Sequence, residues 1–261
     1  MLIEFSKYQG TGNDFILINN FDGKFDKSNL ELIRAMCDRK FGIGADGLMV
    51  LEKINEGDFE LTFFNPDASL SFCGNGSRCA VRFAKDLNLV AQSSIRFKAF
   101  DGWHNAIIHG NGITISMRDV STVEPLTDGV FINTGAPHVV IEKKDLNAID
   151  LIQEGRTIRY DKKYNPVGTN VNFIQSTENG IKVRTYEKGV EDETLSCGTG
   201  VTASALAYAL KHPELSAVEV ETLGGKLNVV FSRKEGVFTD VQLSGPAELV
   251  FKGEYYAKLP S

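Results

Sequence analysis

Hydrophobic and polar residues alternate along short stretches of this chain, and this pattern predicts β-strands. Residues 59–64 and 181–187 place hydrophobic or β-branched side chains at every second position, as half-buried strands do. Short hydrophobic runs between turn residues predict further strands at 48–51, 113–117, 171–175, 218–222, 227–231 and 237–243.

Fewer stretches have the spacing of a helix. Ser28 and Glu31 form a capping box that predicts a helix over about 29–40, and a second helix is expected across about 146–159. A third helix ends near residue 88, after the first of two Cys-Gly-x-Gly sequences. The fourth, over 201–211, is apolar nearly all round, which is typical of a helix buried inside a domain.

The two Cys-Gly-x-Gly sequences belong to an internal repeat. Cys73-Gly74-Asn75-Gly76 precedes one helix, and Cys197-Gly198-Thr199-Gly200 precedes another, 197 − 73 = 124 residues later. Two further landmarks recur in the same order, with offsets of 134 − 11 = 123 and 168 − 44 = 124: Thr11-Gly12-Asn13 with Thr134-Gly135-Ala136, and Gly44-Ala45-Asp46 with Gly168-Thr169-Asn170. A period near half the chain length indicates a duplicated domain.

We therefore expect an α+β fold with two pseudo-symmetric lobes, each a mostly antiparallel or mixed β-sheet wrapped around a central α-helix. The N-terminal lobe is expected to span 1–118 and to carry Cys73, and the C-terminal lobe to span 119–249 and to carry Cys197. The last strand, about 250–261, is expected to pack back on the N-terminal lobe. If the lobes face each other, the active site lies in the cleft between them, with one cysteine on each side.

Composition narrows the class of protein. The 261 residues carry a formal net charge of −6, which argues against nucleic acid or an anionic membrane surface as a partner. No apolar run approaches the roughly 18 residues of a membrane helix, and the first residues lack the pattern of a secretory signal, so a cytoplasmic location is expected. Four cysteines without a Cys-x-x-Cys pair indicate free thiols and no metal site, and no phosphate-loop or dinucleotide fingerprint occurs.

A cysteine directly before a helix lies at the positive end of the helix dipole, among backbone N–H groups without intrahelical partners. That position can lower the pKa of a thiol from about 8.5 toward neutrality. The same N–H groups can bind a carboxylate, and flanking glycines let it approach the backbone. Two such sites, at Cys73 and Cys197, suit a reaction that removes a proton from one face of a carbon and returns one to the other. Cys37 and Cys79 lie in helical hydrophobic patterns and are interpreted as core residues.

Polar residues near the two cysteines are further candidates. Asn65 and Glu187 end the strands that lead to the two cysteines, and each is alternatively a turn former or a solvated side chain. Asn13 follows a turn, and His138 is either a site residue or a histidine satisfied in the core.

In combination, the motifs resemble those of diaminopimelate epimerases, which interconvert LL- and meso-diaminopimelate without a cofactor. The resemblance covers nearly the whole chain. It rests on Gly10-Thr11-Gly12-Asn13-Asp14-Phe15, Gly42-Ile43-Gly44-Ala45-Asp46-Gly47, Phe64-Asn65-Pro66-Asp67, Cys73-Gly74-Asn75-Gly76-Ser77-Arg78-Cys79, Pro137-His138, Asn170-Val171-Asn172-Phe173, Tyr186-Glu187 and Glu193-Thr194-Leu195-Ser196-Cys197-Gly198-Thr199-Gly200.

The resemblance implies a two-base mechanism in which Cys73 and Cys197 alternate as thiolate base and thiol acid. His138 and Glu187 are implied to tune the thiols, and Glu187 also to bind the α-amino group. Backbone amides that would hold the α-carboxylate belong to Gly74, Asn75, Gly198 and Thr199. Further substrate contacts, several of them at the distal end, are implied for Asn13, Asn65, Asn170 and Lys188. The family also implies an amino-acid substrate, no cofactor or metal, a homodimer, and a role in lysine and peptidoglycan precursor synthesis.

Four features depart from the family pattern, and all concern the distal end of the substrate. Ala136 stands where many members have Asn, and Gly47 where some have Gln. Lys188 replaces the usual Arg, which exchanges a bidentate fork for a point charge. The loop over 189–193 is one residue longer than the common pattern.

Other functions also use such a cysteine pair. A related racemase of proline or hydroxyproline is one alternative, although Asn65, Asn170 and Lys188 favour a substrate with a second polar end. A thiol redox protein that forms a reversible disulfide is another. A binding module would not require paired thiols, and an isomerase without the pair is disfavoured because both cysteines are present.

Overall fold

The computed structural model describes residues 2–110 and 112–257. The chain divides into two compact units, called unit 1 (Met1–Ile115 with Pro246–Ser261) and unit 2 (Ser116–Gly245). Both ends of the chain therefore contribute to unit 1.

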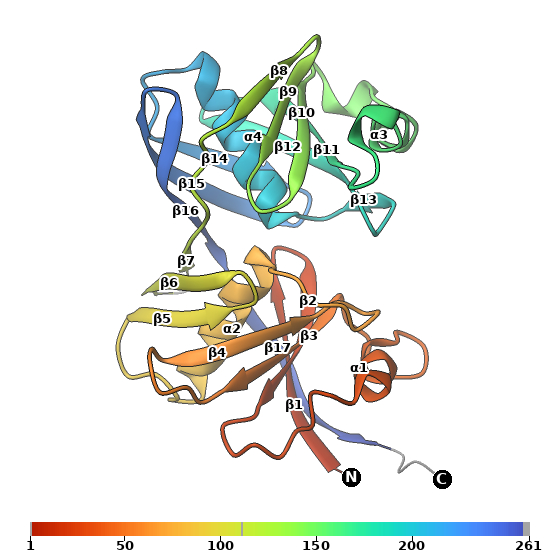
Figure 1. Cartoon of the computed structure of the whole chain (residues 1–261), viewed down its shortest axis with the longest axis vertical. Helices are drawn as coiled ribbons and strands as arrows, with labels where there is room; N and C mark the ends of the chain where they lie inside the picture. Colours follow the sequence, from red (N-terminus) through yellow and green to blue (C-terminus); the bar gives the residue numbers. More distant parts are fainter. Residues whose placement is uncertain (1, 111, 258–261) are drawn as a thin grey trace. The chain divides into compact units, whose positions relative to one another are not determined.

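Unit 1 is a mixed β-sheet that carries helices on both faces (Figure 1). Its strands are β1 (Leu2–Gly10), β2 (Asn13–Asn19), β3 (Gly47–Glu52), β4 (Phe59–Phe64), β5 (Ser94–Ala99), β6 (Gly102–His109), β7 (Gly112–Ser116) and β17 (Glu248–Tyr256). The C-terminal strand β17 pairs antiparallel with β1. From β1 to β6 the successive pairs then alternate between antiparallel and parallel. The last four residues of the expected C-terminal strand lie outside the described residues.

The alternation of side chains along β2 and β3 explains why unit 1 binds a helix on each face. Ile16 and Leu48 belong to a hydrophobic cluster with α1 (Leu30–Cys37). Met49, which points to the other face, lies against α2 (Gly74–Asp86) at Gly76. In consequence α2 is buried along nearly its whole length, including its polar residues.

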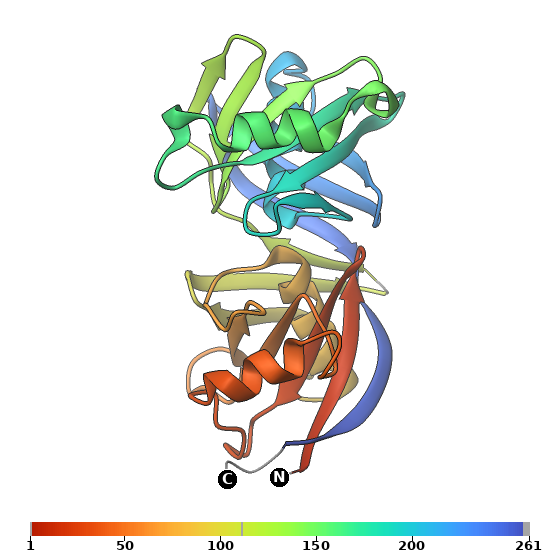
Figure 2. The same cartoon turned by 90° about the vertical axis from the view of Figure 1, so that its right-hand side faces the viewer.

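Unit 2 has the same construction. Its strands are β8 (Val123–Leu126), β9 (Gly129–Asn133), β10 (Pro137–Glu142), β11 (Asn170–Ser176), β12 (Gly180–Glu187), β13 (Asp192–Thr194), β14 (Ala217–Thr222), β15 (Gly225–Lys234) and β16 (Val237–Pro246). The apolar helix α4 (Gly198–Lys211) packs against β9–β12, β14 and β15. Helix α3 (Leu151–Arg159) packs against β11 and β12. In Figure 2, α1 and α3 each lie in front of the sheet of their own unit.

The pairing of the strands confirms the duplication. The pairs β1–β2, β2–β3, β3–β4, β4–β5 and β5–β6 are antiparallel, parallel, antiparallel, parallel and antiparallel. The series β9–β10, β10–β11, β11–β12, β12–β14 and β14–β15 repeats this order. In each unit, a helix follows the second strand of the series, α1 in unit 1 and α3 in unit 2. The helix that begins after a Cys-Gly-x-Gly cysteine, α2 or α4, precedes the fifth strand of the series.

Two helix predictions need correction. The capping box is wrong, because Asn29 rather than Ser28 caps α1 with a hydrogen bond from Leu32 N to Asn29 Oδ1 (3.0 Å). The helix also ends at Cys37, three residues earlier than expected. The expected helix over 146–159 is two elements, a 3₁₀ turn at Leu146–Ala148 and α3, because Asp145 and Asp150 each cap a separate helix start.

Candidate active site

Cys73 is the N-cap residue of α2. Its backbone is extended, and its sulfur accepts a hydrogen bond from the backbone N–H of Gly76 at 3.4 Å. The side chain is half-buried. The thiol therefore lies at the first turn of α2, the end of the helix where the dipole favours negative charge.

Cys197 occupies the equivalent place at the start of α4. Its backbone is extended as well, but the side chain makes no hydrogen bond to the backbone of the first turn. Instead Cys197 Sγ lies 3.5 Å from Thr199 Oγ1. The two thiols thus share a position in the fold and differ in the group that lies against the sulfur, a backbone N–H at Cys73 and a side-chain hydroxyl at Cys197.

Glycine at the third position after each cysteine lets the start of the helix pack closely on its own sheet. A Cβ atom at Gly76 would lie 1.8 Å from Cε of Met49, and one at Gly200 would lie 2.5 Å from Oδ1 of Asn172. Each helix start therefore packs closely on a side chain of its own sheet, which favours glycine at the last position of both Cys-Gly-x-Gly sequences.

His138 lies next to Cys197 within unit 2. It is on β10, it is completely buried, and its Nε2 lies 2.9 Å from Thr199 Oγ1. Burial lowers the pKa of His138 to about 3, and the positive charge of Lys188 acts in the same direction. His138 is therefore a neutral imidazole at physiological pH, connected to Cys197 through the Thr199 hydroxyl.

Because the folded protein keeps His138 neutral, acid should destabilise it. The unfolded chain binds a proton at this residue near its ordinary pKa of 6.5, whereas the folded chain does so only near 3. This contribution to stability is fully present above pH 6.5 and is lost as the pH falls toward 3. Lowering the pH from about 7.5 to about 5 should reduce the free energy of unfolding of the unchanged protein. In His138→Gln this reduction should be smaller by roughly 2 kcal/mol. Denaturant unfolding of both proteins at the two pH values checks this, and an identical pH dependence would contradict it.

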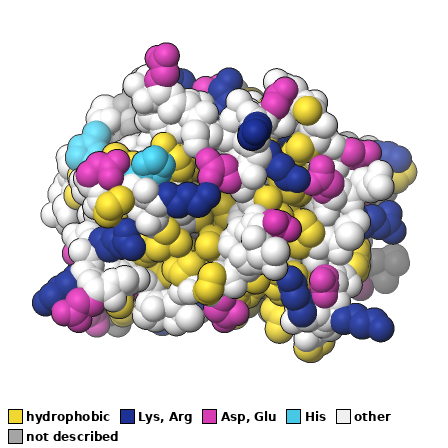
Figure 3. Space-filling model, turned by 90° about the horizontal axis from the view of Figure 1, so that it is seen from above, with side chains coloured by type: hydrophobic (Ala, Val, Ile, Leu, Met, Phe, Trp, Pro, Cys, Tyr) yellow, Lys and Arg dark blue, Asp and Glu magenta, His cyan; other side chains and the backbone are white. Residues whose placement is uncertain are grey.

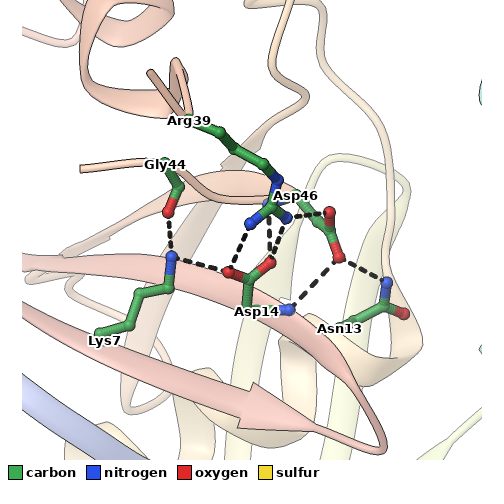
Figure 4. Close-up of polar contacts among 6 residues, drawn as sticks. All are labelled: Lys7, Asn13, Asp14, Arg39, Gly44 and Asp46. Atoms are coloured by element: carbon green, nitrogen blue, oxygen red, sulfur yellow. Dashed lines mark hydrogen bonds and ion pairs between the residues drawn. The ribbon is translucent and has the colours of Figure 1, made fainter. Parts of the chain in front are cut away.

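Asn13 and Asn75 are brought together in unit 1. Asn75 Nδ2 donates to Asn13 Oδ1 at 2.6 Å, and Asn13 Nδ2 donates to Asp46 Oδ2 at 2.9 Å. Figure 4 shows that Asn13 and Asp46 continue into an ion-pair cluster with Lys7, Asp14 and Arg39. Asn13, which follows the β1–β2 turn, is thus held in one orientation beside the second residue of α2.

Two cations of this cluster contact the carboxylate of Asp14. Burial raises the pKa of Asp14, but hydrogen bonds from Arg39 and Lys7 outweigh it and lower that pKa to about 2. The ammonium group of Lys7 is buried and also donates to the backbone carbonyl of Gly44. Asp14 therefore stays ionised at neutral pH, and the contacts of the cluster tie the segment before β3 to β1 and β2.

Asn170, Lys188 and Glu187 are brought together at one end of β11 and β12. Asn170 Nδ2 donates to the carbonyl of Pro137 at 3.0 Å, and its Oδ1 accepts from the backbone N–H of Lys188 at 2.9 Å. Glu187 Oε2 accepts from Thr194 Oγ1 at 2.8 Å. Asn170 therefore links the backbone of Pro137, next to His138, to that of Lys188. The Lys188 ammonium donates to the carbonyl of Val167 at 3.1 Å.

Asn65 lies in the turn between β4 and Cys73. Its amide donates to Ser69 and to Ser71 Oγ, within the segment that leads to the N-cap cysteine. These contacts organise that turn, and they are the ones expected of a turn-forming asparagine.

The other two cysteines are core residues, as the sequence predicts. Cys37 and Cys79 are buried in α1 and α2. Burial raises the pKa of the Cys37 thiol to about 11 and that of Cys79 further. Both remain neutral thiols at physiological pH.

Two buried residues next to the cysteines were not among the predicted site residues. Asn172 contacts His138, and Arg78 on α2 is completely buried, with hydrogen bonds to Thr11 Oγ1 and to the carbonyl of Pro246. Burial lowers the pKa of Arg78 to about 10. A signal existed for Asn172, because it follows Asn170 by two positions and so shares its face of the strand. Arg78 has none, since an arginine in a helix is usually exposed.

A groove on unit 2 is separate from these residues. Its volume is about 1050 Å³, and it is lined by the β8–β9 turn, the end of β10 and the C-terminal turns of α4, including Val140, Lys143, Tyr208 and Lys211. Figure 3, which looks onto unit 2, shows hydrophobic side chains in the middle of this face with charged side chains around them. The groove contains neither cysteine nor any predicted site residue, so it is not the candidate active site.

Within residues 2–110 and 112–257, no three His, Cys, Asp or Glu side chains are grouped so that they could hold a metal ion. In the same part of the chain, no helix is long and apolar enough to cross a membrane.

Comparisons of the sequence with known proteins agree over nearly the whole chain. A family model described as diaminopimelate epimerase matches residues 5–123 and 130–250. The diaminopimelate epimerase of Flavobacterium psychrophilum is 46% identical over 250 residues, which cover 94% of this chain and 97% of that protein. The diaminopimelate epimerase of Aquifex aeolicus is 40% identical over 274 residues, with coverage of 96% and 97%.

Solved structures share the fold at much lower identity. A phenazine biosynthesis protein of the PhzF family from Bacillus anthracis has a TM-score of 0.81 at 14% identity and covers 98% of this chain and 100% of its own. A hydroxyproline epimerase from Agrobacterium vitis, with bound trans-4-hydroxy-L-proline, has a TM-score of 0.72 at 12% identity, with coverage of 97% and 92%. These likenesses confirm the two-lobed α+β fold class.

Proposed function

This chain belongs to the diaminopimelate epimerase family, and we propose that it inverts one α-carbon of diaminopimelate by moving protons through Cys73 and Cys197. The family makes the chain an isomerase of an amino acid, acting between the LL and meso forms. The observation that carries the mechanism is the repeated N-cap position of the two thiols, Cys73 on α2 and Cys197 on α4.

The proposed reaction is balanced in protons and electrons. The thiolate of one cysteine takes the α-hydrogen as a proton, and the electron pair of the broken C–H bond is delocalised toward the carboxylate. The thiol of the other cysteine then gives its proton to the opposite face of the same carbon. One thiolate has become a thiol and one thiol a thiolate, so the reverse reaction uses the same pair with exchanged roles.

The helix starts support this chemistry electrostatically. The backbone N–H groups of Gly74, Asn75, Gly198 and Thr199 lie in the first turns of α2 and α4, where the helix dipole favours an anion, and they can donate to the α-carboxylate. Because they are fixed before the reaction, they stabilise the negative charge that develops as the C–H bond breaks. We assign these amides to the carboxylate and Glu187 to the α-amino group.

Asn13, Asn65, Asn170 and Lys188 are assigned to further substrate contacts, several of them at the distal end. A second amino-acid group offers an ammonium and a carboxylate, which amide side chains and a lysine can bind. The likeness to the hydroxyproline epimerase of Agrobacterium vitis does not indicate the substrate of this chain, because at 12% identity it concerns the fold alone.

Asp46 offers a test of the Asn13 assignment. Asp46→Asn replaces the acceptor of Asn13 Nδ2 with a group that can also donate, so Asn13 loses its fixed orientation toward Asn75. We expect KM for LL-diaminopimelate to rise by roughly tenfold with a smaller change in kcat, because the variant weakens the hydrogen bond that orients Asn13 and the ion pair of Asp46 with Arg39, and both act on binding. Asp22→Asn is the matched control, since Asp22 pairs with the exposed Lys24 in a turn. An unchanged KM in Asp46→Asn would contradict the assignment.

The substrate itself is tested by a panel assay with reduced protein. LL-diaminopimelate, L-proline and trans-4-hydroxy-L-proline are incubated separately, and the stereoisomers are separated by chiral chromatography. We expect conversion of LL-diaminopimelate to the meso form and none of the other two. Turnover of a proline substrate alone would replace the proposed substrate, and absence of any turnover would favour a redox or binding role for the thiols.

We further propose a cytoplasmic homodimer that serves lysine and peptidoglycan precursor synthesis. The dimer is supported by β17, which exposes several large hydrophobic side chains on an outer strand of unit 1: Leu249, Val250, Phe251 and Tyr256. Exposed apolar side chains gathered on one strand are typical of an interface.

Val250→Asp should weaken the dimer. A carboxylate buried against a second copy loses its hydration, so we expect dissociation to rise by tenfold or more in analytical ultracentrifugation, roughly 1.4 kcal/mol or above. Ile152→Asp on α3 is the control, because Ile152 is an exposed hydrophobic residue of unit 2. A dimer that is equally stable in both variants would place the interface elsewhere.

A further inference from the structure

A chain of polar side chains inside unit 2 ends at the sulfur of Cys197. Asn172 Nδ2 lies 3.0 Å from His138 Nδ1, and His138 Nε2 lies 2.9 Å from Thr199 Oγ1. Thr199 Oγ1 in turn lies 3.5 Å from Cys197 Sγ. Asn172 and His138 are both fully buried, so their hydrogen bonds are made within the protein.

The amide of Asn172 has only one orientation that satisfies its neighbours. Nδ2 lies 3.2 Å from the backbone carbonyl oxygen of Val139, which can only accept a hydrogen bond. Oδ1 accepts from the hydroxyl of Thr185 at 3.0 Å. The second hydrogen of the Asn172 amide therefore points at Nδ1 of His138.

This contact fixes the tautomer of His138. A ring nitrogen that accepts a hydrogen bond carries no proton, so the neutral imidazole must carry its hydrogen on Nε2. A proton on Nδ1 would set two donors against each other, and the lowered pKa of His138, about 3, agrees with a ring that stays neutral. His138 Nε2–H then donates to Thr199 Oγ1.

The direction of the remaining hydrogen bond follows. The Thr199 hydroxyl has one hydrogen. Its oxygen lies beside the donor His138 Nε2 on one side and Cys197 Sγ on the other. We propose that Asn172 is a positioning residue for Cys197: by fixing the tautomer of His138, it directs the Thr199 hydroxyl as a donor toward the sulfur and favours the thiolate form of Cys197.

The two cysteines would then be controlled in different ways. The sulfur of Cys73 accepts from a backbone N–H, that of Gly76, whose direction is set by the helix. The sulfur of Cys197 would accept from the Thr199 hydroxyl, whose direction depends on the tautomer of the neighbouring buried His138. The catalytic consequence rests on the proposed role of Cys197, but the tautomer and the state of the thiol can be measured without substrate.

The first test is nitrogen-15 NMR of the unchanged protein with labelled histidine. The protein has four histidines, so His138→Gln assigns the resonances of His138. We expect an unprotonated Nδ1 and a protonated Nε2 from neutral to mildly acidic pH. A proton on Nδ1 would overturn the proposal, whether or not the protein is an epimerase.

The second test follows the alkylation of Cys197 by iodoacetamide as a function of pH, with peptide mass spectrometry to separate it from the other cysteines. In Asn172→Ala both tautomers become available, so alkylation of Cys197 at neutral pH should be about tenfold slower, with its apparent pKa raised. Thr185→Val, which removes the donor to Asn172 Oδ1, should shift the profile in the same direction, whereas Thr185→Ser should keep it. An unchanged pH profile in Asn172→Ala would contradict the proposal.

Discussion

Replacing either Cys73 or Cys197 with serine should lower kcat for the epimerisation of LL-diaminopimelate by about a thousandfold or more, because a hydroxyl is far too weak an acid and too rarely ionised to replace a thiol that exchanges a proton with carbon. Binding of the substrate should change much less, since the carboxylate is assigned to backbone amides that serine leaves in place. Steady-state kinetics and calorimetric titration separate the two effects.

Cys37→Ser is the control for this experiment. Cys37 is buried in α1, away from either Cys-Gly-x-Gly sequence, and burial raises the pKa of its thiol to about 11. We expect nearly unchanged kcat in this variant, with some loss of stability. Full turnover in either Cys73→Ser or Cys197→Ser would mean that this cysteine transfers no proton.

Introducing a side chain at Gly47 should destabilise unit 1 strongly. Gly47 begins β3 and is buried, and a Cβ atom there would lie 2.2 Å from Cε2 of Phe63 and 2.7 Å from the backbone oxygen of Phe64. The backbone atom cannot move aside as a flexible side chain can, so we expect Gly47→Ala to lower the free energy of unfolding by about 2–3 kcal/mol and Gly47→Gln by more. Denaturant unfolding measures both.

Gly112→Ala provides the comparison, because the nearest atom to its Cβ would be the carbonyl oxygen of His109 at an ordinary 3.5 Å. Its effect should stay within about 0.5 kcal/mol. Equal stability of Gly47→Gln and the unchanged protein would show that β3 and β4 shift apart. In that case the fold could accommodate the glutamine that some members of the family have at this position, and packing would not explain why this chain has glycine there.

The two-lobed architecture could be predicted from the sequence because each landmark of the repeat occurs in both halves of the chain. β4 was expected over 59–64 and is observed at Phe59–Phe64, since buried hydrophobic residues alternate with partly exposed polar residues from Phe59 to Phe63. The two helices that follow the Cys-Gly-x-Gly sequences were predicted because the sequences match. In both, the last glycine lies close to a side chain of a neighbouring strand.

What the sequence could not predict depends on hydrogen bonds between distant segments. The cap of α1 was misplaced by one residue because Ser28 and Asn29 are both good N-cap residues, and the structure gives Ser28 to Asp26 instead. The orientation of Asn13 depends on Asp46, and that of His138 depends on Asn172, 34 residues away. Such partners carry no periodic signal, and only the folded sheet brings them into contact.

Deuterium incorporation during turnover tests the two-base mechanism most directly. Unlabelled LL-diaminopimelate is incubated with reduced protein in deuterium oxide, and at early conversion the α-hydrogen of substrate and product is analysed separately by mass spectrometry. With one cysteine on each face, the meso product carries deuterium from the solvent at the inverted carbon, while the remaining LL substrate carries almost none. Product that retains the hydrogen of the substrate, or equal label in both stereoisomers from the start, would instead indicate a single base and contradict the assignment of Cys73 and Cys197 as a pair.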